Sequence, residues 1–585
     1  MTTARSVQAS IHHDKPVPTR GDSGFWGSDV VTEVLRNLDL PYIALNPGAS
    51  YRWLHDSLVN YLGNRNPQML LCLHDETTVS IAQGYAKTSG RMMAAAVHAN
   101  VGLMHACMPI FDAWCDRIPV LILGATGPMD AAKRRPWIDW IHTCADQAGL
   151  VRNFTKWDNQ PGSVKAATEA ILRAAQIAQT APRGPVYVVL DSAVQEEKLE
   201  QLPTLPDVAR YAAAAASPSA ETVKQAADLL SNAKNPLLLL GGCSRDLQAW
   251  DARVQLAEKL NMPVLTQLRL GAAFPTDHRL HVAPPANRLA AATRELVGRA
   301  DVILALEWLD LAGTFKQALG DKPVSAKVIQ VSCDVHAHRG WNFDYQGLAP
   351  ADVQLLCESD AAVAPLLAAV RVRTGAVPAK LKIAPLSESS ADGLNLSVLA
   401  QAFNAAVRGK AFCITRLPLG WNGAYAHFRH PLDYIGYDGG AGVGSGPGIT
   451  VGAALALKGS GRLPIGVLGD GDFLMGNTAV WTAVHYKIPC LIVVSNNRSF
   501  FNDERHQENI AKARNRPPEN RWIGQHIGNP DIDLAAMARS MGAVGIGPVT
   551  TAEEMGPAFA RGVQAVEKGE VCVIDARVAP GYDAE

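Results

Sequence analysis

The chain has 585 residues and a formal net charge of −1, with 48% hydrophobic and 19% charged residues. This length predicts several domains, and the near-zero charge without a Lys/Arg cluster gives no electrostatic basis for binding nucleic acid. No apolar run reaches the roughly 18 residues of a membrane span, and the polar N-terminus lacks the apolar segment of a secretory signal.

The ten cysteines are scattered along the chain, and none forms a C-x-x-C pair. Several lie within apolar runs, which predicts buried free thiols in a reducing compartment. We therefore expect a cytoplasmic protein that binds neither membrane nor nucleic acid. The cysteines are Cys72, Cys107, Cys115, Cys144, Cys243, Cys333, Cys357, Cys413, Cys490 and Cys572.

Three segments of the chain share one pattern, in which short apolar strands alternate with alanine-rich amphipathic helices. This pattern predicts parallel sheets covered by helices on both faces, so we expect an α/β protein with three doubly wound domains. Two linkers rich in Pro, Ala, Ser and charged residues separate the segments. The predicted domains are residues 20–195, 218–372 and 392–585.

The expected strands follow in chain order from the apolar runs. In the first domain they lie within residues 41–48, 69–75, 93–100, 118–126 and 184–191. In the second domain they lie within residues 235–242, 262–267, 301–308 and 326–334. In the third domain they lie within residues 463–470, 488–497 and 570–578.

A glycine–aspartate turn and an asparagine pair end two successive strands of the third domain. Gly469, Asp470 and Gly471 end the first strand, and Asn496 and Asn497 end the second. In a β-α-β unit both strands run the same way, so Asp470 and Asn497 emerge on one edge of the sheet. Their oxygens suit Mg²⁺, and the helix start between the strands can hold phosphates. The alternative is an isolated turn followed by an unrelated asparagine pair.

This G-D-G and N-N arrangement resembles the signature of thiamine-diphosphate-dependent enzymes. The resemblance covers the whole chain, in the family order of pyrimidine-binding, central and diphosphate-binding domains, and favours the group of benzoylformate decarboxylase and acetolactate synthase. It implies thiamine diphosphate and Mg²⁺ as cofactors. It also implies that the metal ligands are Asp470, Asn497 and the backbone carbonyl of Ser499.

The resemblance further implies residues that activate and support the cofactor. Glu76 stands between a strand and a helix that contains the family's G-Y-A, and is the expected carboxylate for the pyrimidine ring. A lone glutamate at a helix start would otherwise complement the helix dipole. The glycine-rich residues 437–448 resemble the turn over which the family bends the cofactor. There, Val443 is the expected apolar support and Ala441 the expected carbonyl donor to the aminopyrimidine.

Three residues are candidate catalytic groups near the reacting carbon, and His506 is the alternative to Asp503 as a proton carrier. His98 matches the pocket histidine of the family, and a neutral imidazole is a suitable proton shuttle, although a structural histidine is the alternative. His142 lies where acetolactate synthases and benzaldehyde lyase place a glutamine. Asp503 stands at the offset from Asn497 that a catalytic acid has in pyruvate decarboxylases. It begins a charged insert that we expect to form a helix and a mobile cover, or else a solvated excursion.

Two departures from the family pattern bear on the substrate and on FAD. Ala49 replaces the substrate-contacting serine of the benzoylformate decarboxylase loop, and Ser50 follows one residue late. Residues 305–315 do not match the R-F-D-D-R segment of FAD-binding members, and the second domain carries no G-x-G-x-x-G after a strand. FAD is therefore possible but unsupported.

The resemblance implies an enzyme that makes or breaks a carbon–carbon bond next to a carbonyl of a small substrate. Our first expectation is a 2-oxo acid decarboxylase or carboligase that works through a C2-carbanion and an enamine. The alternative is a lyase for a 2-hydroxy ketone, 1,2-diketone or 2-hydroxyacyl thioester. A non-catalytic paralogue would lack Glu76, Asp470 or Asn497, and a nicotinamide dehydrogenase would need a fingerprint that is missing. Since the family holds the two cofactor ends in different subunits, we expect a homodimer or homotetramer with the site at the interface.

Overall fold

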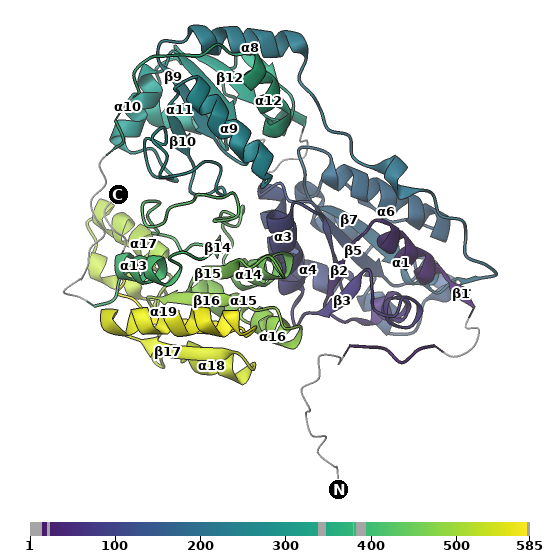
Figure 1. The fold of residues 1–585 in the computed structure, drawn as a ribbon. Helices are drawn as coiled ribbons and strands as arrows, with labels where there is room; N and C mark the ends of the chain where they lie inside the picture. The colour runs from purple at the N-terminus through teal and green to yellow at the C-terminus, as the bar shows by residue number, and fades with distance from the viewer. Residues whose placement is uncertain (1–13, 20–23, 337–346, 378, 382–392, 582–585) are drawn as a thin grey trace.

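The structure is a computed structural model that describes residues 14–19, 24–336, 347–377, 379–381 and 393–581. It contains three parallel sheets covered by helices, which confirms the predicted α/β architecture. We call the three layered bodies the N-terminal, central and C-terminal units. Figure 1 shows the central unit above the other two, which lie side by side.

The N-terminal unit is built on a six-stranded parallel sheet in the order β3-β2-β4-β5-β7-β6. Its strands are β2 (Tyr42–Leu45), β3 (Gln68–Leu71), β4 (Met93–Val97), β5 (Val120–Thr126), β6 (Asp158–Asn159) and β7 (Val186–Asp191). Its helices are α1 (Gly27–Asn37), α2 (Arg52–Asp56), α3 (Asp75–Ser89), α4 (Ala99–Cys115), α5 (Ile138–Ile141), α6 (Val164–Gln179) and α7 (Ser192–Gln195). A small antiparallel pair, β1 (Phe25–Trp26) with β8 (Lys198–Leu199), joins the two ends of this unit.

The central unit has a five-stranded parallel sheet in the order β10-β9-β11-β12-β13. Its strands are β9 (Pro236–Leu240), β10 (Val264–Thr266), β11 (Val302–Leu306), β12 (Lys327–Val331) and β13 (Val353–Leu355). Its helices are α8 (Ala220–Asn232), α9 (Leu247–Lys259), α10 (Ala291–Arg299), α11 (Leu311–Leu319) and α12 (Ser359–Ala369).

The C-terminal unit has a second five-stranded parallel sheet, in the order β14-β15-β16-β18-β17. Its strands are β14 (Phe412–Arg416), β15 (Leu463–Gly469), β16 (Leu491–Asn496), β17 (Val544–Val549) and β18 (Cys572–Arg577). Its helices are α13 (Leu396–Ala406), α14 (Ser445–Ala456), α15 (Asp470–Gly476), α16 (Thr478–His485), α17 (Phe501–Ala513), α18 (Leu534–Ser540) and α19 (Ala552–Glu567).

Helices α3 and α14 join the N-terminal unit to the C-terminal unit and run side by side in Figure 1. Glycines allow their backbones to touch: a Cβ at Gly84 would lie 2.2 Å from the carbonyl oxygen of Ile449, and one at Gly452 would lie 2.0 Å from that of Ile81. One apolar cluster continues across this contact, from Val79 of α3 into the C-terminal unit. The contact therefore fixes the start of α3 against the loop that precedes α14.

Every strand expected from the sequence is present, but some strands were not predicted. Strand β17 contains Gly545, Gly547 and Pro548, which are typical of loops. Strands β6 and β13 are very short, and β14 had no alternating pattern. The boundaries of the three domains stay predictions, and those at residues 20, 392 and 585 fall outside the described residues.

Two further expectations concern the cysteines and membrane spans. All ten cysteines are free, and all except Cys107 and Cys144 are buried. The cytoplasmic location inferred from them stays a prediction. Within the described ranges, no helix is both long enough and apolar enough to cross a membrane.

Candidate active site

The predicted metal edge lies at the carboxyl end of β15. The strand ends at Gly469, and α15 begins with Asp470 itself, so the carboxylate belongs to the first helical turn. One oxygen of Asp470 accepts the Gly471 N–H at 2.8 Å, and the other accepts the Ser499 N–H at 3.1 Å. The side chain is 4% exposed, and this burial raises its pKa to about 6.

Asn497 follows β16, next to β15 in the sheet. Its side-chain oxygen accepts the same Ser499 N–H, at 2.9 Å. Asp470 and Asn497 therefore present oxygens to one point, as the β-α-β argument predicted. The preceding Asn496 instead donates to Asp575 at 2.8 Å and is buried in the sheet. Of the two asparagines, the second is the one that faces the edge.

The donor set at this edge fits a hard divalent cation. Asp470 takes part in no ion pair with any described residue, although it is a buried carboxylate. A cation there would offset the cost of burying its charge. In the described part of the chain, no cluster of three or more His, Cys, Asp or Glu side chains could hold a metal. The set Asp470, Asn497 and the Ser499 carbonyl depends instead on amide and backbone oxygens, which suit Mg²⁺.

The segment after this edge supports Ser499. The Ser499 hydroxyl donates to the Glu504 carboxylate, which is buried on α17 and lies 3.5 Å from Arg521. Arg521 belongs to a short 3₁₀ turn, Pro518–Trp522. The insert thus contains the expected helix, followed by a short turn, and its role as a cover stays a prediction. Asp503 is exposed in the first turn of α17, and its catalytic role stays a prediction.

Glu76 lies in the first turn of α3, whose start is capped by the His74 ring accepting the Glu76 N–H. Its carboxyl faces the glycine-rich turn: a Cβ at Gly444 would lie 2.6 Å from a Glu76 oxygen, and Gly444 has φ +113°. Burial raises the pKa of Glu76 to about 7, and the negative charge of Asp472 adds to this effect. The two halves of the predicted cofactor site thus meet within one chain.

The glycine-rich turn carries the other two predicted cofactor residues. Ala441 is exposed and adopts φ +54°, and Val443 is partly buried two residues later. Met108 of α4 packs beneath this turn, 2.3 Å from where a Cβ at Gly442 would stand. The assigned roles of Ala441 and Val443 stay predictions.

His98 and His142 form a pair whose ring centroids lie 4.6 Å apart at 67°. The backbone N–H of His98 donates to the carboxylate of Asp75, which precedes Glu76 in the chain, at 3.3 Å. Burial, and secondarily the neighbouring His142, lowers the pKa of His98 to about 4. The imidazole is therefore neutral at physiological pH, the form a proton acceptor needs.

Ser50 lies in the site, although the sequence analysis gave it no role because it follows one residue after the family's serine position. Its hydroxyl lies 2.8 Å from the Nδ1 atom of His98 and is buried. A Cβ at Gly48 would lie 2.0 Å from the same imidazole, so only glycine lets the loop come this close. The loop residue that meets the histidine is thus the one following Ala49.

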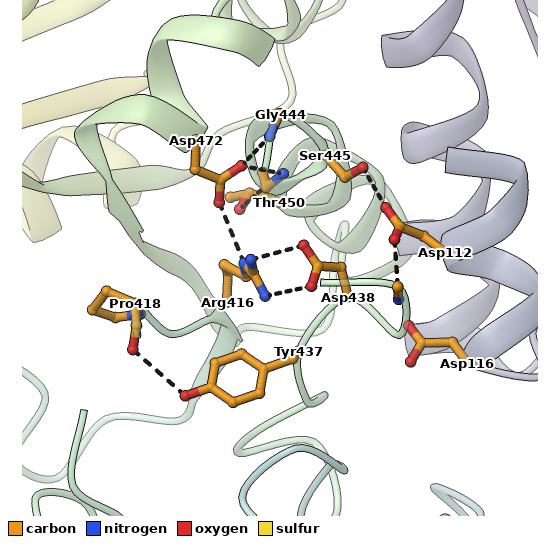
Figure 2. Close-up of polar contacts among 12 residues, drawn as sticks. Asp112, Asp116, Arg416, Pro418, Tyr437, Asp438, Gly444, Ser445, Thr450 and Asp472 are labelled. Atoms are coloured by element: carbon orange, nitrogen blue, oxygen red, sulfur yellow. Dashed lines mark hydrogen bonds and ion pairs between the residues drawn. The ribbon is translucent and has the colours of Figure 1, made fainter. Parts of the chain in front are cut away.

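Sequence reasoning missed a buried charge network around the turn, which Figure 2 shows. Asp472 and Asp438 both pair with Arg416, at the end of β14. A second aspartate in the G-D-G-D stretch and an arginine that ends an apolar run were the available signals. Neither signal alone indicates that these residues meet.

Comparisons with known proteins match the chain in three parts, in the order of its three units. Three models of the thiamine pyrophosphate enzymes match the chain: the N-terminal TPP binding domain over residues 25–150, the central domain over 223–356 and the C-terminal TPP binding domain over 418–576. Benzoylformate decarboxylase of Pseudomonas aeruginosa is 26% identical over 80% of this chain and 85% of its own length. The acetolactate synthase large subunit of Lactococcus lactis is 24% identical over 83% of each chain.

Solved structures share the fold. A 4-hydroxybenzoylformate decarboxylase of Rhodococcus jostii is 22% identical, with a TM-score of 0.75 over 96% of this chain and 100% of its own. Benzoylformate decarboxylase of Polynucleobacter necessarius is 20% identical, with a TM-score of 0.78 over the same shares.

Proposed function

Because the chain belongs to the thiamine pyrophosphate enzymes, we propose that it is a thiamine-diphosphate- and Mg²⁺-dependent 2-oxo acid decarboxylase or carboligase. The observation that carries this proposal is the Glu76 carboxyl, which lies against Gly444 and has a pKa of about 7. When bound, thiamine diphosphate supplies the electron sink for the bond that breaks or forms. The protein must bind it, orient it and move protons.

Binding is assigned to the edge of the C-terminal sheet. Asp470, Asn497 and the Ser499 carbonyl would hold Mg²⁺, and the metal would in turn hold the diphosphate. The backbone amides at the start of α15 lie beside these ligands and would add their partial positive charge. On the glycine-rich turn, Ala441 would offer its carbonyl and Val443 its apolar side chain.

Proton transfer is assigned to the N-terminal unit. A glutamate with a pKa near neutrality can hold or release a proton at the pyrimidine ring, so burial suits Glu76 to activation. His98 is already neutral and can accept a proton, with Ser50 fixing its ring and His142 beside it. The pair would serve the substrate side of the site.

A substrate panel tests the proposed function. Pyruvate, benzoylformate and benzoin would be supplied to the wild-type protein and to Glu76→Gln, each with and without thiamine diphosphate and Mg²⁺. We expect carbon dioxide or a ligated product from a 2-oxo acid, dependent on both cofactors and strongly reduced in the variant. Cleavage of benzoin alone would instead indicate a lyase, and turnover independent of the cofactors would refute the proposal.

We also propose that the chain forms a homodimer or homotetramer, as the family resemblance implies. Co-expressed Glu76→Gln and Asp470→Asn chains test where the site lies. If two subunits share each site, the hybrids regain about a quarter of wild-type activity, because half of the dimers are mixed and each has one intact site. If one chain supplies both residues, as in the structure described here, no activity returns.

A further inference from the structure

The glycine-rich turn is anchored by an aspartate of the C-terminal unit that binds no predicted ligand. One oxygen of Asp472 accepts the N–H groups of Gly444 at 2.8 Å and Gly446 at 3.1 Å. Gly444 is also the residue that meets Glu76. Figure 2 shows Asp472 beside Gly444. Asp472 therefore holds the part of the turn that the activating carboxylate touches.

Arg416 holds the second oxygen of Asp472. Its Nε atom lies 3.3 Å from that oxygen, and its other nitrogens bind Asp438 at 2.7 and 2.9 Å. All three side chains are at most 9% exposed, so their charges gain little from water. Because Asp438 begins the turn and Asp472 holds its end, Arg416 ties the two ends together.

A second aspartate anchors the turn from the N-terminal unit. Asp112 of α4 accepts the Ser445 hydroxyl at 2.6 Å and the Gly440 N–H at 3.1 Å. It is fully buried, and this burial raises its pKa. The turn is thus held on one side by Asp112 and on the other by Asp472, as Figure 2 shows.

These anchors act on a stretch that would otherwise be poorly ordered. Residues 439, 440, 442, 444 and 446 are all glycine. Glycine loses more backbone entropy on ordering than any other residue, so this turn is costly to order. A turn of this composition without anchors would have to be ordered by its ligand, at the expense of affinity.

We propose that Asp472, held by Arg416, and Asp112 are positioning residues that keep the glycine-rich turn in its cofactor-binding shape before the cofactor arrives. This inference rests on the proposed function, because it assigns the turn to thiamine diphosphate. Asp472 acts through the main chain of Gly444 and Gly446. It differs in this from Asp470, whose oxygens face the metal edge.

The test compares Asp472→Asn with Asp433→Asn in the full-length protein freed of cofactor. Asp433 is a matched control, because it is buried, accepts two backbone N–H groups and pairs with Arg462 in the same unit. Within the described chain, none of these contacts of Asp433 reaches residues 439–446. Amide exchange of residues 439–446 and the Kd for thiamine diphosphate with Mg²⁺ would be measured for both variants.

We expect Asp472→Asn to weaken cofactor binding about tenfold and to speed exchange in the turn, because the amide group turned toward Arg416 cannot replace a carboxylate. Asp433→Asn should change neither measurement, even where it lowers thermal stability as much. Equal changes in both variants, or an unchanged Kd in Asp472→Asn, would overturn the inference. A wild-type protein that binds no thiamine diphosphate would refute the proposed function instead.

A milder variant keeps the inference testable if Asp472→Asn does not fold. Ser445→Ala removes only the hydroxyl that Asp112 accepts. We expect it to weaken cofactor binding severalfold and to speed exchange of the same amides. Exchange and Kd both equal to wild type in Ser445→Ala would exclude the bond between Ser445 and Asp112 as an anchor of the turn.

Discussion

The central and C-terminal units have sheets of the same kind, yet the acids at their strand ends are used differently. In the C-terminal unit, Asp470 follows β15 and pairs with no described cation. In the central unit, Asp334 follows β12 and binds Arg117 through two bonds of 2.5 and 2.6 Å, and Glu358 follows β13 and lies 3.1 Å from Arg183. The arginines come from the N-terminal unit. The acids that end the central strands thus have arginine partners, whereas Asp470 has no cationic partner among the described residues.

This difference shows when an acid at a strand end indicates a ligand site. The carboxyl ends of the central strands, which we call the central edge, border a cavity of about 220 Å³. The presence of space alone therefore does not identify a ligand site. Two further acids of the central unit line this cavity: Asp360 lies 3.1 Å from Arg253, and Glu307 is partly buried, which raises its pKa. The difference lies in the arginines: Asp334 and Glu358 each have one, and Asp470 has none among the described residues.

The largest expected effect comes from removing that charge. We expect Asp470→Asn to lower kcat on the order of a thousand-fold and to abolish activation by Mg²⁺, because the metal loses its carboxylate ligand. Asp334→Asn makes the same change at the central edge and should leave Mg²⁺ activation intact. Titration of activity with Mg²⁺ measures both. Equal Mg²⁺ dependence in the two variants would remove the distinction between the edges.

A smaller loss is expected from His98→Ala, about a hundred-fold in kcat/KM, since a positioned proton acceptor disappears. Because the pKa of His98 is lowered to about 4, the imidazole does not titrate above pH 5. The acid limb of the pH profile should therefore stay in place. Ser50→Ala, which removes only the bond to the ring, should lose about tenfold. An acid limb that moves in His98→Ala would show that the histidine titrates near neutrality.

The stability of the cofactor-free protein should depend on Glu76. Its folded pKa of about 7 lies above the ordinary 4.5, so the folded form keeps a proton that the unfolded form releases between these values. The contribution of Glu76 to the free energy of unfolding is therefore full below pH 4.5 and is lost as the pH rises through 7. We expect Glu76→Gln to be more stable than wild type by about 1–2 kcal/mol at pH 8, after allowing for solvent screening, and not at pH 4. Denaturant unfolding at both values measures this, and a gain at pH 4 alone would contradict it.

The smallest effect is expected at the central edge. A double-mutant cycle of Arg117→Met and Asp334→Asn should give a coupling of about 1 kcal/mol in unfolding, because the pair is only partly buried. The Kd for thiamine diphosphate should stay within about twofold, since the strand-end acids of this edge are already paired with arginines. A large loss of cofactor affinity would show that the central edge contributes to the site.

The sequence predicted those parts of the site that depend on one strand end and its direction. Asp470, Asn497 and Glu76 each follow an apolar strand, and parallel topology then determines the edge on which they emerge. The pairing of Asp472 with Arg416 could not be predicted, because β14 was not recognised and its partner lies 56 residues away. The bond from Ser50 to His98 depends on how close a glycine loop approaches, which strand periodicity does not report.

The contact between α3 and α14 has a consequence for how reproducible the site is. Where Gly84 meets Ile449 and Gly452 meets Ile81, peptide groups touch without side chains between them. The separation of these helices is then set by the radii of backbone atoms, which do not change with rotamer or with the identity of neighbouring side chains. Glu76 lies two turns from Gly84 on the same helix. The distance between Glu76 and the glycine-rich turn is therefore set by main-chain contacts, which vary less than side-chain packing does.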